Sequence, residues 1–160
     1  MGLQLREGYS DRDTVRALFL EYTEYLISQD AKFRHYLELQ NYDRELDHLE
    51  VKYGRPNGRL YVAYWDGAPA GCIALLPSED RSAELKRLYV RPAFRGRGVA
   101  KALVARLLSD AREIGYSHMR LDTLPFLVEA IALYRKFGFR EIPPYNDNPL
   151  GTSIYMKLDL

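Results

Sequence analysis

The sequence is poor in features that define several classes of protein. Cys72 is the only cysteine in 160 residues, which excludes an internal disulfide bond and a zinc site built from cysteines. No apolar run is long enough to cross a membrane, and the N-terminal segment lacks the apolar core of a signal peptide. We therefore expect a cytoplasmic protein without a membrane partner. Cys72 lies in the apolar run 70–76, where we expect a buried core residue.

The chain also lacks a strong net charge, since 23 basic and 22 acidic side chains leave +1. This balance argues against nucleic acid as a partner. The charge is uneven, however, because residues 81–101 carry seven basic side chains and one acidic side chain, Glu84. A neutral protein with one concentrated basic segment is typical of a discrete anion site. No group of His, Asp and Glu has the spacing of metal ligands, so no metal is expected.

The length suits one domain, spanning residues 1–160, with a core of its own. Hydrophobic periodicity predicts strands over 2–7, 60–65, 70–76, 83–90, 118–123, 139–142 and 152–158. It predicts helices from Asp11 to about 26, over roughly 42–53, over 98–114, and over 126–137 with Pro125 in the first turn. The order combines a hairpin meander with a βαβ crossover. It therefore predicts a mixed α/β (α+β) fold, with one sheet and helices on both faces.

The strand at 83–90 changes its apolar parity. Leu85 is an odd-numbered apolar residue, whereas Leu88 and Val90 are even-numbered. A regular strand with one buried side keeps its apolar residues on one parity. The slip near 87–88 therefore predicts a β-bulge, and bulges often lie beside active sites.

The segment RPAFRGRGVAKAL, residues 91–103, joins this strand to the clearest helix. Gly96 and Gly98 allow a sharp turn that directs several backbone N–H groups one way, and Arg95 and Arg97 add positive charge. Such a helix start suits a phosphate or pyrophosphate. The segment lacks the Gly-Lys-Ser/Thr of a mononucleotide loop and follows a late strand, unlike a dinucleotide motif. A phosphorylated cofactor of another kind fits; the alternative is an exposed basic loop.

The same residues resemble the GNAT family of N-acetyltransferases. Residues 95–100, RGRGVA, match its Arg/Gln-x-x-Gly-x-Gly/Ala signature, and AIALYRKFGF at 130–139 resembles its later Ala-x-x-Leu-Tyr-x-x-x-Gly-Phe block. The order of elements is also similar, so the resemblance covers nearly the whole chain. It implies the acyl-CoA N-acyltransferase fold, with a mostly antiparallel sheet in which one parallel pair splays apart at the bulge.

The resemblance implies acetyl-CoA as co-substrate. Its pyrophosphate would lie on the start of the helix, and its pantetheine arm would pair with the strand near Leu88 and Val90. Backbone amides near Leu88 and Tyr89 would polarise the thioester carbonyl. The expected cofactor-binding residues are Leu88, Tyr89, Val90, Arg95, Gly96, Arg97, Gly98, Val99, Ala100 and Lys101.

Acetyl transfer to an amine requires two proton movements, because an alkyl ammonium has a pKa of about 10 and a thiol a pKa of about 8.5. Tyr134 matches the tyrosine with which this family protonates the departing sulfur; the alternative is a core aromatic residue. Glu84, the one acid in the basic segment, is a candidate base acting through water; the alternative is a salt bridge with Lys86 or a flanking arginine.

The resemblance implies an acceptor that is the primary amine of a small molecule or an amino-acid-like compound. Tyr145 and Asn148, in the loop before the last strand, are candidate substrate contacts, although loop residues such as Asn148 also serve simply as turn formers. Two other functions stay open, a protein or peptide N-acetyltransferase and a non-catalytic acyl-CoA-binding module. Members of the family often pair through sheet edges, so a homodimer is one expected assembly.

Overall fold

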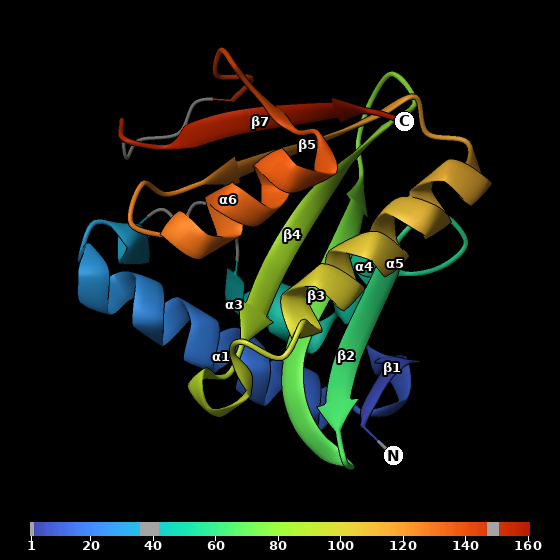
Figure 1. Ribbon diagram of the computed structural model, residues 1–160, viewed down its shortest axis with the longest axis vertical. Coiled ribbons are helices and arrows are strands. Elements are labelled where there is room, and N and C mark those ends of the chain that lie inside the picture. The colour runs from blue at the N-terminus through green and yellow to red at the C-terminus, as the bar shows by residue number, and fades with distance from the viewer. Residues whose placement is uncertain (1, 36–41, 147–150) are drawn as a thin grey trace.

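The computed structural model describes residues 2–35, 42–146 and 151–160. Within them, seven strands form one sheet in the order β1-β2-β3-β4-β5-β7-β6, and only the β4–β5 pair is parallel (Figure 1). The strands are β1 Leu3–Glu7, β2 Arg59–Trp65, β3 Ala68–Pro77, β4 Ser82–Val90, β5 His118–Thr123, β6 Arg140–Ile142 and β7 Ile154–Asp159. The predicted mixed, mostly antiparallel sheet is confirmed.

Helices cover both faces of the sheet. They are α1 Arg12–Gln29, α3 Tyr42–Asp47, α4 Leu49–Tyr53, α5 Val99–Ile114 and α6 Val128–Phe137. One core cluster joins the sheet to α1, α3 and α4, and a second joins its other face to α5 and α6 (Figure 1). None of the described helices has the length and apolar content that a membrane-spanning segment needs.

Two predicted helices differ in detail. The helix expected over 42–53 is interrupted at His48, whose backbone leaves the helical region (φ −136°, ψ 60°) and separates α3 from α4. Pro125 lies before α6 rather than in its first turn, because the N–H of Leu127 donates to the carbonyl of Leu124 (3.0 Å) and closes a separate turn. A proline disfavours helical geometry in the residue before it, which explains why β5 leads into a turn.

Two features at the centre of the sheet, a hairpin turn and a buried cysteine, are as the sequence predicts. Asp66 and Gly67 connect β2 to β3, and both have the positive φ (49° and 85°) that a tight two-residue hairpin turn requires. Cys72 is fully buried, and burial raises the pKa of its thiol above the ordinary value. This cysteine is therefore a core residue, as predicted.

The predicted bulge is present in β4. Arg87 and Leu88 together lie opposite a single residue of β3, Ile73, and Arg87 has a φ of 59°. Beyond this region the parallel pair opens, because β4 and β5 pair only over residues 82–84 and 118–120. Among the described residues, the second half of β4 therefore has no ladder partner on its β5 side.

Candidate functional site

The N-terminus of α5 has the geometry of an anion site. Gly96 and Gly98 both have positive φ (78° and 77°), a conformation that is strained for other residues. The N–H of Ala102 donates to the carbonyl of Gly98 (3.1 Å). The N–H groups of residues 99–101 therefore have no carbonyl partner within the helix. These donors and the positive end of the helix dipole favour a phosphate group.

The open edge of β4 lies next to this turn. The N–H of Arg91 donates to the carbonyl of Ala70 on β3 (2.8 Å). Because backbone groups alternate sides along an antiparallel strand, Tyr89 directs its N–H and C=O toward β3, and Val90 directs its own toward the open edge. The carbonyl of Val90 accepts a hydrogen bond there from the Arg95 side chain (3.1 Å).

The direction of the backbone groups in β4 distinguishes the two amides, of Leu88 and Tyr89, that were expected to polarise the thioester carbonyl. The N–H of Tyr89 is directed to the β3 side, so it is poorly placed for that role. Leu88 lies in the bulge, outside the register that its neighbours keep with β3. Of the two amides considered, the one of Leu88 is the better candidate.

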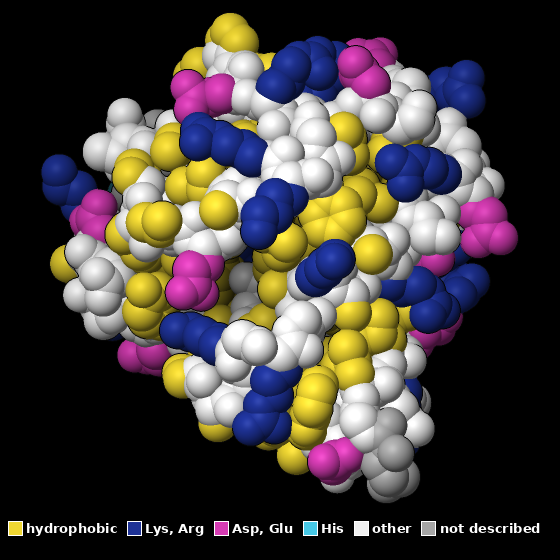
Figure 2. Space-filling view, in the orientation of Figure 1, with side chains coloured by type: hydrophobic (Ala, Val, Ile, Leu, Met, Phe, Trp, Pro, Cys, Tyr) yellow, Lys and Arg dark blue, Asp and Glu magenta, His cyan; other side chains and the backbone are white. Residues whose placement is uncertain are grey.

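A groove of about 710 Å³ connects the open edge of β4, the start of α5 and α6. It is lined by nine of the ten expected cofactor-binding residues: Leu88, Tyr89, Val90, Arg95, Gly96, Gly98, Val99, Ala100 and Lys101. The exception is Arg97, whose guanidinium stacks over the rings of Trp65 (5.2 Å) and Phe94 (5.7 Å). Figure 2 shows a hollow on this face, with hydrophobic side chains on its walls and Lys and Arg side chains around it.

A smaller cavity of about 50 Å³ adjoins the groove on the α1 side of the bulge. Its lining includes the polar side chains of Lys86, Asp122 and Ser153. Three residues, Tyr22, Leu88 and Leu127, line both the groove and the smaller cavity. The two spaces therefore meet beside the bulge, between α1 and the start of α6.

Tyr134 lies in α6 with its side chain in the lining of the smaller cavity. It is only 5% exposed, and its ring packs edge-on against Phe139 with 5.7 Å between ring centres. Burial raises the pKa of the Tyr134 hydroxyl, and the nearby Tyr22 and Asp122 raise it further. The phenol is therefore protonated at neutral pH and is available as a proton donor.

Glu84 is engaged in local contacts. Its carboxylate lies 3.3 Å from the Nζ of Lys86 and accepts a hydrogen bond from the Tyr145 hydroxyl (3.4 Å). The salt bridge considered as the alternative is therefore present, and Glu84 lines neither the groove nor the smaller cavity. Asp122, 3.8 Å from the same Lys86 nitrogen, does line the smaller cavity beside Tyr134.

Asp122 was not among the site residues expected from the sequence, although the alternation of buried and outward-facing residues in β5 points to it. Met119 and Leu121 are buried in the core with α5, so His118, Arg120 and Asp122 point to the opposite face. Asp122 is also the last of these before the strand ends. An acid at that position lies where β4 and β5 have already diverged.

Tyr145 faces the polar surface of the sheet. Its ring lies under the guanidinium of Arg120 (4.3 Å) and packs against Tyr155 with 5.1 Å between ring centres. Asn148, the other expected substrate contact, lies outside the described residues. In the part of the chain that the structure describes, no group of three His, Cys, Asp or Glu side chains could hold a metal ion.

Comparisons with known proteins agree with this geometry. A family model for the acetyltransferase (GNAT) family matches residues 15–139. An uncharacterised N-acetyltransferase of Schizosaccharomyces pombe is 38% identical over 152 residues, covering 94% of this chain and 89% of that protein. The N-acetylaspartate synthetase of Homo sapiens is 38% identical over 111 residues, 68% of this chain and 36% of that protein.

A solved structure shows the same fold. The PaiA N-acetyltransferase of Thermoplasma acidophilum, in complex with coenzyme A, superposes with a TM-score of 0.73 at 18% identity over 100% of both chains. This chain therefore belongs to the GNAT family and is an acetyl-CoA-dependent N-acetyltransferase.

Proposed function

We propose that residues 1–160 act as one acetyltransferase domain on the primary amine of a small molecule or an amino-acid-like compound. The observation that carries this proposal is the meeting of the groove and the smaller, polar cavity at Leu88, with Tyr134 in the wall. A partly enclosed cavity suits a small acceptor better than a protein surface. The relative named N-acetylaspartate synthetase supports an amino-acid-like acceptor.

The groove fits the cofactor of this family in both volume and chemistry. Acetyl-CoA supplies an acetyl group activated as a thioester. In the proposal, the N–H groups at the start of α5 bind the pyrophosphate, with Lys101 adding positive charge. Arg97 contributes through its backbone, because its side chain stacks on Trp65 and Phe94. The open edge at Leu88 and Val90 binds the extended arm.

Two side chains handle the protons. Tyr134 holds the proton that the departing thiolate accepts, because a phenol is protonated at neutral pH, and the tyrosinate then recovers a proton from water. We propose Asp122 rather than Glu84 as the acceptor of the amine proton. Asp122 lines the cavity, whereas Glu84 is held by Lys86 and Tyr145 away from it.

Thiol release from acetyl-CoA across a panel of small amines, amino acids and short peptides tests the proposed function. Replacing the proton donor in Tyr134→Phe should lower kcat about 100-fold or more and leave the dissociation constant of coenzyme A within about twofold. If tight coenzyme A binding comes with no thiol release for any amine, the proposal fails in favour of a non-catalytic binding module. Turnover of peptides alone would favour the protein acceptor.

The same assay separates the two candidate bases. Asp122→Asn should lower kcat/KM about 100-fold, most strongly at low pH where the free amine is scarce. Glu84→Gln should lower it less than about fivefold, because Glu84 lies outside the cavity. The reverse order of the two effects would reassign the proton acceptor to Glu84.

A further inference from the structure

Arg87 has an unusual backbone for a strand residue. Among the described residues, four other than glycine have positive φ, and Asp66, Asp80 and Arg81 lie in turns between strands. Arg87 is the one within a strand, with φ of 59° at the bulge of β4. A side chain disfavours this conformation, so the surrounding structure must hold it in place.

The side chain of Arg87 is held by a buried acid of α3. Its Nε and Nη2 atoms each donate to a carboxylate oxygen of Glu45 on α3, both at 2.8 Å. The Arg87 and Glu45 side chains are 6% and 0% exposed. Glu45 also accepts from the Nζ of Lys52 (2.8 Å). We call the contact between Arg87 and Glu45 the bulge ion pair.

The paired form of Glu45 is strongly favoured in the folded protein. Burial alone would raise the pKa of this carboxyl, but hydrogen bonds and charge from Arg87, and then from Lys52, lower it to about 2. Both partners are therefore charged at any physiological pH. A bidentate pair of this kind fixes orientation as well as distance.

Arg87 lines the smaller cavity, and the next residue, Leu88, is one of three that line both the cavity and the groove. A rotation about φ of Arg87 would turn the peptide that carries the N–H of Leu88. A second contact holds the chain just after β4, where Arg91 donates to Glu21 of α1 at 2.6 and 3.0 Å. Acids of α3 and α1 therefore hold the side chains of Arg87 and Arg91, which alternate along the chain with Leu88 and Val90.

We propose that Arg87 and Glu45 are positioning residues, whose ion pair holds the bulge so that the Leu88 amide faces the groove. This inference rests on the proposed function for its effect on catalysis. The ion pair couples α3 to the edge of β4 that is proposed to receive the cofactor. Neither side chain is assigned contact with the reacting atoms.

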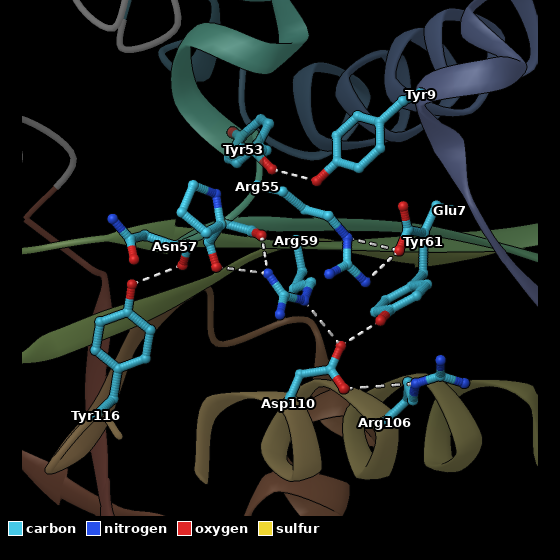
Figure 3. A network of polar contacts seen from close by, with 12 residues as sticks. Glu7, Tyr9, Tyr53, Arg55, Asn57, Arg59, Tyr61, Arg106, Asp110 and Tyr116 are labelled. Atoms are coloured by element: carbon cyan, nitrogen blue, oxygen red, sulfur yellow. Dashed lines mark hydrogen bonds and ion pairs between the residues drawn. The ribbon is translucent and has the colours of Figure 1, made fainter. Parts of the chain in front are cut away.

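The molecule contains a matched control. Figure 3 shows a second network, in which the buried Asp110 of α5 binds Arg59 (Nε–Oδ2 3.2 Å) and the hydroxyl of Tyr61. We call the contact between Arg59 and Asp110 the α5 ion pair. Its side chains are 9% and 10% exposed, and neither lines the groove or the smaller cavity. It therefore reports what a buried ion pair does for stability alone.

Backbone NMR without cofactor tests the positioning role directly. Glu45→Gln keeps the shape of the acid and removes its charge, so the amide resonances of residues 87–90 should shift or broaden. Asp110→Asn should leave those four resonances in place. Undisturbed amides at 87–90 in Glu45→Gln would overturn the inference, whatever the protein's activity.

Calorimetric titration with coenzyme A gives the second readout. Glu45→Gln and Arg87→Gly should each weaken binding about tenfold, and Asp110→Asn less than twofold, at a temperature where all are folded. Glycine accepts positive φ without strain, so Arg87→Gly separates the ion pair from backbone preference. Arg87→Lys keeps the positive charge but loses the planar guanidinium that donates two parallel hydrogen bonds. Its affinity for coenzyme A should therefore be intermediate.

The outcomes separate this inference from the proposed function. Equal effects of Glu45→Gln and Asp110→Asn on a wild-type protein that binds coenzyme A would refute the positioning role and leave the proposed function intact. Wild-type affinity in Arg87→Gly would also refute it. A wild-type protein that does not bind coenzyme A would overturn the proposed function, and with it the effect on cofactor binding, whereas the NMR result would still decide whether the pair holds the bulge.

Discussion

The bulge ion pair and the α5 ion pair have similar chemistry and different surroundings. Each buries an arginine of the sheet against an acid of a helix, and all four side chains are at most 10% exposed. Arg59 is the first residue of β2 and pairs in register with Leu75 of β3, whereas Arg87 lies at a bulge with positive φ. We therefore expect the local backbone to decide what a buried ion pair does. Beside a regular strand it contributes stability alone, whereas at a bulge it also holds the geometry of a binding site.

Both members of the α5 ion pair have further polar partners. Arg59 also donates to the carbonyls of Pro56 (2.8 Å) and Gly58 (2.7 Å), and Asp110 lies 3.6 Å from the exposed Arg106. These contacts join β2, α5 and the turn before β2 into one unit (Figure 3). The loss of one member therefore leaves the others with partial compensation.

The largest expected effect is on stability. Glu45→Ala and Asp110→Ala each leave a buried guanidinium without its acid, which should cost about 3–5 kcal/mol of the free energy of unfolding. Glu45→Ala should be the more costly, because Glu45 is 0% exposed and Asp110 is 10% exposed. Urea denaturation measures both. A loss below about 1 kcal/mol for either variant would show that its pair is already solvated.

The second largest expected effect is the loss of folding stability at low pH. The pKa of Glu45 is lowered from 4.5 to about 2 in the folded protein. A depressed pKa contributes stability that is complete above about pH 4.5 and is lost as the pH falls toward 2. The shift corresponds to about 3 kcal/mol.

Chemical denaturation between pH 5 and pH 2 checks this. Glu45→Gln has no charge to lose at this position, so its stability should fall less steeply than that of the wild type over the same range. Parallel curves for the two proteins would mean that other carboxyl groups dominate acid unfolding. The Asp110→Asn protein, measured alongside, shows how much of the difference belongs to Glu45.

The sequence predicted the local features of the site and missed the long-range ones. The parity change in 83–90 located the bulge, because a period of two is visible in neighbouring residues. Gly96 and Gly98 located the start of α5 by the backbone conformation they permit. Each of these signals lies within about ten residues of chain.

The bulge ion pair had no such signal. Glu45 and Arg87 are 42 positions apart, and Glu45 is one of 11 acids in residues 1–50. Asp122 was missed for a related reason, since its role depends on where β4 and β5 separate. Pairings between distant segments follow from tertiary packing, which one sequence does not reveal.

We expect the smallest effect on stability from substitutions at the two ends of α5. This helix connects the groove to the α5 ion pair. Gly98 precedes α5 and Gly115 follows it, with φ of 77° and 103°, and a Cβ at either position meets no atom closer than 3.9 Å. Gly98→Asp and Gly115→Asp should therefore each cost about 1–2 kcal/mol through backbone strain. Only Gly98→Asp places a negative charge where the pyrophosphate is proposed to bind, so it should weaken coenzyme A binding about 100-fold while Gly115→Asp stays within about twofold. Calorimetry and thermal unfolding of the two variants measure both quantities, and equal coenzyme A affinities would remove the start of α5 from the cofactor site.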